Sequence, residues 1–254
     1  MIALLGGTSE TAGIAARLTG MGFKVTALTA TDIPLDVGPE GVTRRAGRMD
    51  AGEMARLFAR IGAKAVVDAT HPFATIARAN AREAAKAAGT PYLTYVRPAA
   101  VEPYEKLQIA AAHDEAAAMA FSYRRPVLLT TGSKVLAPYA RLAEQTGVPL
   151  TARVLDHPDS VAACLAAGIA RENIIAARGP FTVAQNFEHI ERFDIGVMVT
   201  KDSGAAGGTL EKIEAARRKA IPLIMVRRGA AAPDGAFDNI DALLAAVAAA
   251  LEGR

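Results

Sequence analysis

Five short segments of this sequence combine glycine with hydroxylated and charged residues, and each directly follows a run of apolar residues. Hydroxyl and backbone N–H groups can bind phosphate oxygens, lysine and arginine can bind carboxylates, and a histidine or lysine can move a proton. Loops that serve only as connectors would use generic turn residues. The five segments are GGTSE (6–10), DATHPFA (68–74), TTGSK (130–134), ARGPF (177–181) and TKDSGAAGGT (200–209).

The first segment lies between a predicted strand, residues 2–5, and a predicted helix, residues 11–18. Gly6 and Gly7 therefore occupy the bend, where unpaired N–H groups at the start of a helix can receive a phosphate. The G-x-G-x-x-G fingerprint of dinucleotide sites fails in either register. From the residues alone, the segment is either a phosphate site or only a tight turn.

The next two segments also allow two interpretations. Asp68, Thr70 and His71 either contact a ligand or cap a helix that begins near Phe73. TTGSK resembles the end of a phosphate-binding P-loop, but the upstream glycine is missing and the lysine follows the serine, so an NTPase is disfavoured. Of the four histidines only His71 lies in such a segment, and we expect the others at the surface: His113, His157 and His189.

The last segment contains a structural part. Gly207 and Gly208 permit a tight turn, and Thr209 can cap a predicted helix over residues 210–220. That capping leaves three residues unexplained: Lys201, Asp202 and Ser203.

Composition excludes several classes of protein. The chain has 254 residues, 51% of them hydrophobic, and a net charge of +3 without a basic run, so nucleic-acid binding is weakly supported. No apolar run is long enough to cross a bilayer and no basic leader is present, so we expect a cytoplasmic protein. The single cysteine, Cys164, is expected to be a buried, inert thiol, and no metal-site motif occurs.

Apolar segments alternate with alanine-rich helical ones along most of the chain, which predicts parallel sheets covered by helices on both faces. The alternation pauses over residues 96–126, where prolines and charges interrupt it. We therefore predict an α/β protein of two doubly wound, Rossmann-like domains, residues 1–124 and 125–254, with a cleft between them. The predicted strands lie within residues 2–5, 24–29, 63–70, 91–96, 126–131, 148–155, 172–179, 195–202 and 221–228.

The order and spacing of four segments, GGTSE, DATHPFA, TTGSK and TKDSGAAGGTLEKIEAA, resemble the precorrin-6A reductase family of cobalamin biosynthesis. The resemblance covers essentially the whole chain. It implies an NADPH-dependent reduction of one carbon–carbon double bond in a tetrapyrrole macrocycle, converting precorrin-6A to precorrin-6B, without flavin or metal. Related reductases act on a cobalt-containing intermediate, and the cobalt-free substrate is the one we favour.

The resemblance assigns the segments to ligands. We predict that the cofactor contacts Gly6, Gly7, Thr8, Ser9, Thr70, Thr131, Gly132 and Ser133. Arg48 follows the second predicted strand, which has no acidic residue before Asp32, and an arginine there suits the 2′-phosphate of NADPH. The predicted contacts to the tetrapyrrole polycarboxylate are Lys134, Arg178, Lys201, Asp202, Ser203 and Gly204.

For catalysis, His71 or Lys201 is expected to stabilise or deliver the proton that accompanies hydride transfer. For each of these charged residues the alternative is a surface ion pair. A different class of function is a non-catalytic, dinucleotide-responsive binding protein whose second half recognises a partner. Tight NADPH binding without NADPH oxidation by any plausible tetrapyrrole would favour that alternative.

Overall fold

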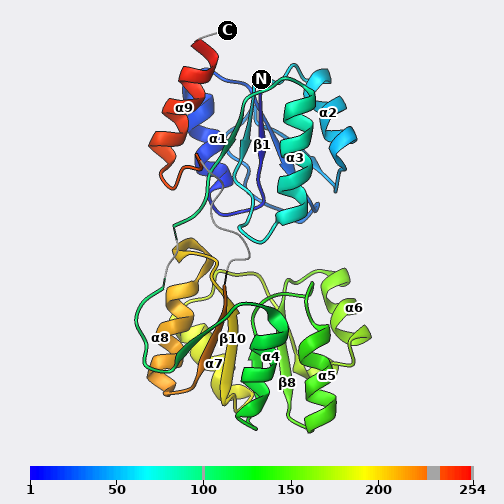
Figure 1. The fold of residues 1–254 in the computed structure, drawn as a ribbon, viewed down its shortest axis with the longest axis vertical. Helices are drawn as coiled ribbons and strands as arrows, with labels where there is room; N and C mark the ends of the chain where they lie inside the picture. Colours follow the sequence, from blue (N-terminus) through cyan, green and yellow to red (C-terminus); the bar gives the residue numbers. More distant parts are fainter. Residues whose placement is uncertain (99–100, 228–234, 253–254) are drawn as a thin grey trace. The chain divides into compact units, whose positions relative to one another are not determined.

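A computed structural model describes residues 1–98, 101–227 and 235–252. The chain forms two compact units (Figure 1). Unit 1 comprises Met1–Pro98 and Ala230–Arg254, and unit 2 comprises Ala99–Gly229. The second unit is thus an insertion between the body of the first unit and its C-terminal helix.

Unit 1 contains a five-stranded parallel sheet in the order β3-β2-β1-β4-β5. Side chains alternate between its faces, so Ile2 and Leu4 pack under α1 and α9 while Ala3 and Leu5 pack under α2 and α3. Both faces are buried, as is typical of parallel sheets. The strands are β1 (Ile2–Leu5), β2 (Val25–Thr29), β3 (Thr43–Ala46), β4 (Ala65–Asp68) and β5 (Tyr92–Thr94). The helices are α1 (Thr11–Gly20), α2 (Ala51–Arg60), α3 (Thr75–Ala87) and α9 (Ile240–Glu252).

Unit 2 contains a six-stranded parallel sheet in the order β6-β11-β10-β7-β8-β9. One face packs against α4, α5 and α6, and the other against α7 and α8. The strands are β6 (Leu107–Ala110), β7 (Val127–Leu129), β8 (Leu150–Val154), β9 (Ile174–Ala176), β10 (Val197–Lys201) and β11 (Leu223–Val226). The helices are α4 (His113–Ser122), α5 (Ala137–Thr146), α6 (Pro158–Ala166), α7 (Val183–Arg192) and α8 (Thr209–Lys219), with single 3-10 turns η1 (Arg171–Asn173) and η2 (Ala205–Gly207).

Each sheet has one point where the direction of winding reverses. In unit 1 the chain runs outward from β1 through β2 to β3 and then returns to β4 on the other side of β1. In unit 2 it runs from β7 through β8 to β9 and returns to β10 on the other side of β7. Ligands of doubly wound sheets bind at the carboxyl ends of the strands beside this switch point. Four of the five predicted segments follow β1, β4, β7 and β10, so they occupy the two switch points.

The predicted α/β class with two parallel sheets is confirmed, but the bounds of the two units differ from the predicted division at residue 125. Strand β6 pairs with β11 in the second sheet although it precedes that boundary, and α9 packs against α1, β4 and β5 of the first unit. The sequence prediction also missed β3 and β6. Both are edge strands, and the sequence of β3, TRRA, is polar and mostly exposed, so it lacks the apolar pattern of a buried strand.

Cys164 lies on α6 and is fully buried, as expected, and burial raises the pKa of its thiol. In the described part of the chain, no helix combines the length and the apolar character that a membrane crossing requires.

Candidate functional site

The loop after β1 makes a tight turn that closes on the start of α1. The Oγ1 atom of Thr11 accepts hydrogen bonds from the backbone N–H groups of Gly7 (3.1 Å) and Thr8 (3.2 Å). A Cβ atom at Gly6 would lie 2.5 Å from the Thr11 side chain, and Gly7 has a φ of +104°, so both positions need glycine. Thr11, where the dinucleotide fingerprint would have glycine, therefore builds this turn through its side chain.

The two loops of the first switch point contact each other. The hydroxyl of Thr8 donates a hydrogen bond to the carbonyl of Ala69, in the loop after β4, over 3.1 Å. Thr8 is buried, whereas Gly7 is exposed and a Cβ atom there would meet nothing within 4 Å. The backbone at Gly7 is thus open to the close approach of a ligand.

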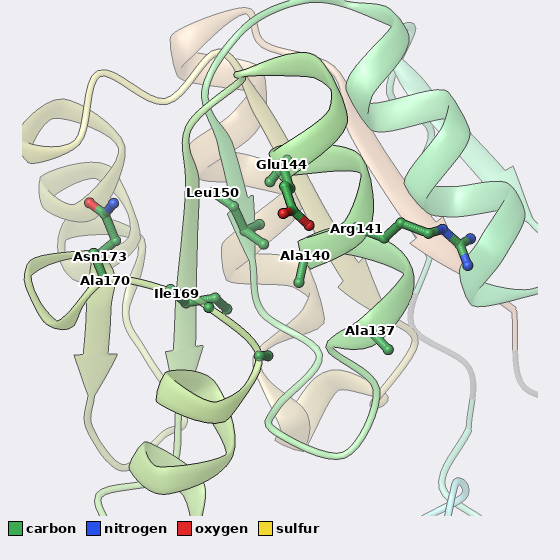
Figure 2. Close-up of a pocket in the computed structure, with 11 residues that line it drawn as sticks. Ala137, Ala140, Arg141, Glu144, Leu150, Ile169, Ala170 and Asn173 are labelled. Carbon is green, nitrogen blue, oxygen red and sulfur yellow. The ribbon is translucent and has the colours of Figure 1, made fainter.

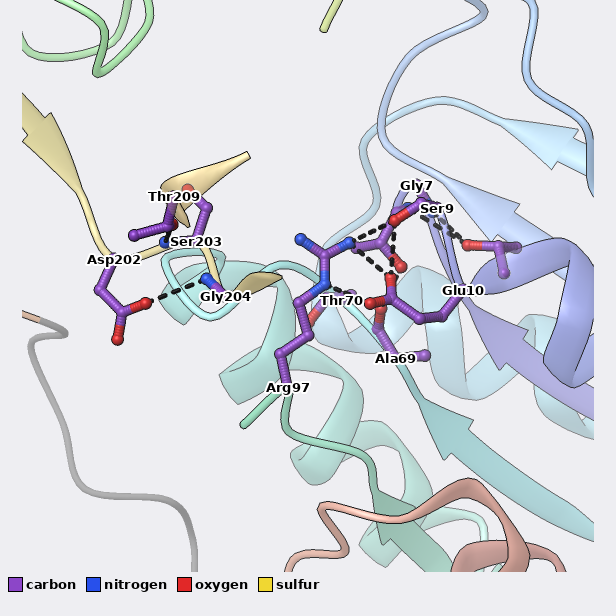
Figure 3. Close-up of polar contacts among 12 residues, drawn as sticks. Gly7, Ser9, Glu10, Ala69, Thr70, Arg97, Asp202, Ser203, Gly204 and Thr209 are labelled. Carbon is purple, nitrogen blue, oxygen red and sulfur yellow. Dashed lines mark hydrogen bonds and ion pairs between the residues drawn. The ribbon is translucent and has the colours of Figure 1, made fainter. Parts of the chain in front are cut away.

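A largely buried ion pair joins the segment after β5 to the residue that precedes α1 (Figure 3). Arg97, just after β5, pairs with both carboxylate oxygens of Glu10, the residue that precedes α1, and its Nη2 atom donates to the Ser9 hydroxyl over 2.8 Å. Burial would raise the pKa of Glu10, but the hydrogen bonds and charge of Arg97 outweigh it, so the pKa is lowered. Arg97 is a site residue that the sequence prediction missed.

Asp68, the last residue of β4, is fully buried and organises the adjoining loop. Its Oδ1 atom accepts hydrogen bonds from the N–H (2.9 Å) and hydroxyl (2.6 Å) of Thr70. Its Oδ2 atom accepts from Arg78 Nε (2.9 Å) and from the Tyr92 hydroxyl (2.6 Å). Burial, followed by the charge of Asp68, raises the pKa of Tyr92 far above its ordinary value. These four contacts compensate the buried carboxylate and fix the position of Thr70.

The structure contradicts the capping interpretation of this segment. Helix α3 begins at Thr75, and its N-cap residue, Ala74, provides no side-chain hydrogen bond. His71 instead lies in the turn before the helix, where its Nδ1 atom accepts the N–H of Phe73 (3.3 Å) and the two rings are in tilted contact. The imidazole of His71 is partly exposed next to Thr70.

Arg48 is exposed and follows β3, whereas its neighbour Arg44 has a structural role. The guanidinium of Arg44 donates to the Thr29 hydroxyl (3.1 Å) and to the carbonyls of Thr31 (2.8 Å) and Ile33 (2.7 Å). Arg44 therefore holds the loop after β2, and Arg48 has no hydrogen bond or ion pair with any described residue.

At the second switch point, the loop after β7 contains a buried hydroxyl to which no described residue forms a hydrogen bond. Thr130 donates to the carbonyl of Val199 in β10 (2.8 Å), which joins the two loop-bearing strands. The next residue, Thr131, is only 5% exposed, and its Oγ1 atom has no hydrogen-bond partner in the described part of the chain. Gly132 adopts a φ of +86°, and the Ser133 hydroxyl bonds to a serine of α6 (3.3 Å). A buried hydroxyl without a partner is unfavourable, which marks Thr131 as a position where a ligand could complete the hydrogen bonding.

The loop after β10 is folded by its own side chains (Figure 3). Asp202 and Ser203 are both buried; the Asp202 carboxylate accepts the N–H of Gly204 (3.0 Å), and the N–H of Ser203 donates to the Thr209 hydroxyl (3.1 Å). The prediction that Thr209 caps the following helix is wrong. Gly208 is the N-cap residue of α8 and no side chain caps it, because Thr209 is the first helical residue and its hydroxyl binds Ser203.

Lys201, the last residue of β10, lies near the positive charge of Lys134. Burial, and next the charge of Lys134, lower the pKa of Lys201 to about 8. Lys134 itself is exposed. Burial and then Lys201 lower the pKa of His113, whose Nδ1 atom lies 2.9 Å from the hydroxyl of the buried Tyr139. The expectation that His113 lies at the surface is therefore wrong, because its ring is half-buried among these groups.

Unit 2 contains two further buried cations that the sequence prediction missed. Burial lowers the pKa of Arg153 on β8 to about 10, and burial followed by Arg153 lowers the pKa of Lys212 on α8 to about 7. His189, also expected at the surface, contacts Arg153 and is half-buried. Arg178, a predicted substrate contact, lies in the exposed loop after β9. Because β9 is two strands from β7, this loop is outside the second switch point.

A separate pocket of about 650 Å³ contains none of the predicted site residues (Figure 2). It lies between α5 and the segment that joins α6 to β9, beside the first residue of β8. Its polar lining residues are Arg141, Glu144 and Asn173. This pocket is therefore distinct from both switch points.

Comparisons with known proteins agree on one family. Residues 1–248 match the family described as Precorrin-6x reductase CbiJ/CobK. The chain is 35% identical over 230 residues to the cobalt-precorrin-6A reductase of Priestia megaterium, covering 90% of each chain. It is 32% identical over 249 residues to the precorrin-6A reductase of Rhodococcus erythropolis, covering 97% of this chain and 96% of that one. The solved structure of the CobK precorrin-6A reductase has a TM-score of 0.82, with 25% identity over 98% of this chain and 96% of that one.

Proposed function

This chain belongs to the Precorrin-6x reductase CbiJ/CobK family, and from that membership we propose that it reduces precorrin-6A to precorrin-6B with NADPH. It is a reductase of cobalamin biosynthesis that acts on a carbon–carbon double bond, and its family implies a nicotinamide cofactor in general. The observation that carries the proposal is that four ligand-type loops fall at the switch points of two parallel sheets.

The first switch point fits a dinucleotide. Gly7 leaves open space beside the start of α1, and N–H groups at a helix N-terminus favour phosphate. Gly6, Gly7, Thr8 and Ser9 would hold the pyrophosphate, with Arg97 offsetting the negative charge of Glu10 beside it. When bound, the cofactor supplies the hydride. Thr70, held by Asp68, would extend this surface.

The preference for NADPH over NADH is assigned to Arg48. Its guanidinium is exposed after β3, at the edge of the first sheet beside β2, and has no described partner. An arginine at this place can bind a 2′-phosphate bidentately. Arg44, which is nearer in sequence to β2, is already occupied by the loop it holds.

The second switch point supplies positive charge to a polycarboxylate. Lys201 and Lys134 lie close enough to repel each other, and a carboxylate between them would relieve that repulsion. The backbone around Asp202, Ser203 and Gly204 shapes the same loop, and Arg178 would reach the periphery of the macrocycle. We also propose Thr131, Gly132 and Ser133 as cofactor contacts, because the buried Thr131 hydroxyl has no hydrogen-bond partner among the described residues.

For the proton, Lys201 is the first candidate and His71 the second. A lysine whose pKa is near 8 exchanges its proton readily at neutral pH, whereas an ordinary lysine remains protonated. His71 lies in the adjoining loop of the first switch point and has a ring nitrogen engaged with Phe73. Its other ring nitrogen would hold or donate the proton.

Relatives of the chain bear the names of both substrate forms, so the cobalt-free substrate is part of the proposal. The test is to supply the purified protein with NADPH and, in parallel, with precorrin-6A and its cobalt complex. We expect faster NADPH oxidation with precorrin-6A and formation of a product with two additional hydrogens. Faster turnover of the cobalt complex would assign the chain to the other form. NADPH binding without oxidation in either case would favour the non-catalytic alternative.

A further inference from the structure

Arg153 is a buried arginine without a carboxylate partner. It lies within β8, is 5% exposed, and its Nη1 atom contacts Asn186 Oδ1 (2.9 Å) and His189 Nδ1 (3.1 Å). The ring of Phe181 covers the guanidinium with its centroid 4.0 Å away. No ion pair joins Arg153 to the part of the chain that the structure describes, and its buried Nη2 atom has no hydrogen-bond partner.

Lys212 is a second buried cation that, like Arg153, has no carboxylate partner among the described residues. It is 7% exposed, and among the described residues its Nζ atom donates only to the carbonyls of Gly207 (3.2 Å) and Gly208 (3.0 Å). It lies in the first turn of α8, where the helix dipole disfavours a positive charge. Within the described residues, Lys212 also forms no ion pair.

These groups converge on the start of α8. The charge of Arg153 acts on Lys212, and Phe181, which covers Arg153, has its backbone nitrogen 3.7 Å from the position that a Cβ atom at Gly208 would take. Gly208 is the N-cap residue, and α8 has no side-chain cap. The N–H groups of the first turn of α8 are therefore not bonded by a capping side chain.

The other charged groups here do not neutralise the pair. Glu211, in the first turn of α8, acts favourably on Lys212, but among the described residues its buried Oε2 atom has no hydrogen-bond partner and it forms no ion pair. Lys201 adds positive charge to Lys212, and burial together with Arg153 lowers the pKa of His189, which favours its neutral form. One negative charge thus faces at least two positive ones, and a buried uncompensated charge is strongly unfavourable.

We propose that Arg153, Lys212 and the uncapped first turn of α8 form an oxyanion subsite that receives one peripheral carboxylate of the tetrapyrrole substrate. The inference rests on the proposed function for the identity of the ligand. A carboxylate would bind Arg153 Nη2 and the Lys212 ammonium once the half-buried Phe181 ring moves aside. A phosphate of the dinucleotide has the same chemistry, so the experiment separates the two sources.

The experiment measures binding, so that it does not depend on turnover. The thermal midpoint of the whole protein is followed with uroporphyrin, a stable tetrapyrrole polycarboxylate, and separately with NADPH. The variants are Lys212→Met and Arg153→Gln, with Arg192→Gln on α7 as a matched control, because Arg192 is exposed. We expect the apparent affinity for uroporphyrin to fall about tenfold in both test variants, with NADPH affinity unchanged. The control should bind both ligands normally.

Lys212→Met is the decisive variant if Arg153→Gln fails to fold. Below pH 7, where Lys212 is charged, removing this uncompensated buried ammonium should raise the midpoint of the ligand-free protein. A lysine that only braces the Gly207–Gly208 turn should lower the midpoint when it is replaced. Weaker NADPH binding with normal uroporphyrin binding would overturn the substrate assignment. Normal binding of both ligands by a folded Lys212→Met protein would overturn the subsite. A wild-type protein that binds uroporphyrin through these residues but does not reduce precorrin-6A would contradict only the proposed function.

Discussion

The two switch points share a topology but differ in how their charges are compensated. In unit 1 the buried carboxylate of Asp68 pairs with Arg78, and the partly buried carboxylate of Glu10 pairs with Arg97. In unit 2 the buried cations Arg153 and Lys212 have no ion pair among the described residues. Two sheets with the same switch-point topology therefore carry different charges: one loop cluster is nearly neutral and the other has excess positive charge. The first suits a cofactor bound through backbone N–H groups, and the second suits a polycarboxylate.

The largest effect expected from this comparison is at Lys201. Lys201→Ala should lower kcat/KM for precorrin-6A about a hundredfold, or roughly 2.7 kcal/mol, because it removes the proposed charge contact to the substrate and the proposed proton donor. The NADPH dissociation constant should stay within twofold. Steady-state kinetics with each substrate varied in turn would measure both. Normal saturation by precorrin-6A at the normal rate would make Lys201 only a surface charge.

At the first switch point, a substitution can remove the positive charge that compensates the Glu10 carboxylate. Arg97→Met should weaken NADPH binding about thirtyfold, or roughly 2 kcal/mol, because it leaves the Glu10 carboxylate uncompensated beside the cofactor phosphates. The double variant Arg97→Met/Glu10→Gln should recover part of that loss. Calorimetric titration with NADPH would decide, and a double variant that binds as weakly as Arg97→Met would show that charge compensation is not the role of Arg97.

Lys212 makes the stability of the protein depend on pH. Its pKa is lowered to about 7 in the folded protein from a value of 10.5, so between these pH values the unfolded chain binds the additional proton. Stability should therefore rise with pH across this window, by about 1 to 2 kcal/mol after allowance for solvent relaxation around the ammonium. Denaturant unfolding at several pH values would measure it. In Lys212→Met this component of the rise should be absent, and an identical pH profile would contradict the assignment.

The smallest expected effect concerns cofactor preference. Arg48→Ala should reduce the preference for NADPH over NADH about fivefold, or roughly 1 kcal/mol, because an exposed charge contact to the 2′-phosphate is partly screened. Arg45, exposed on β3 in the same sheet, is the matched control. Dissociation constants for both cofactors would be compared. Equal affinity of the unmodified protein for NADPH and NADH would remove the premise.

The sequence was sufficient to place the loops but not to find their partners. Apolar strands followed by GGTSE, DATHPFA, TTGSK and TKDSG predicted the switch-point loops because strand ends are a local property. Arg97 was missed because its partner Glu10 is 87 residues away in sequence. Thr209 was misassigned as a cap because its hydroxyl could equally bind Ser203, and only the folded loop decides between them.

Arg153 did leave a signal in the sequence that could have been used. It is a charged residue inside the apolar strand segment VPLTARVL, and a buried strand with an arginine requires a partner for it. Lys212 left none, because a lysine in a helix rich in charged residues is ordinarily a solvated one. Its burial follows from the packing of α8 on β10 and α7, which is not encoded in the local pattern.

The claim that the loop after β1 and the loop after β10 bind different ligands is tested most directly by hydrogen–deuterium exchange with one ligand at a time. NADPH alone should slow exchange of the backbone amides in residues 6–11, after β1, more than in residues 200–212. Uroporphyrin alone should protect residues 200–212, after β10 and into α8, and leave residues 6–11 unchanged. Protection of residues 6–11 by uroporphyrin, together with protection of residues 200–212 by NADPH, would contradict the assignment of ligands to the two sheets.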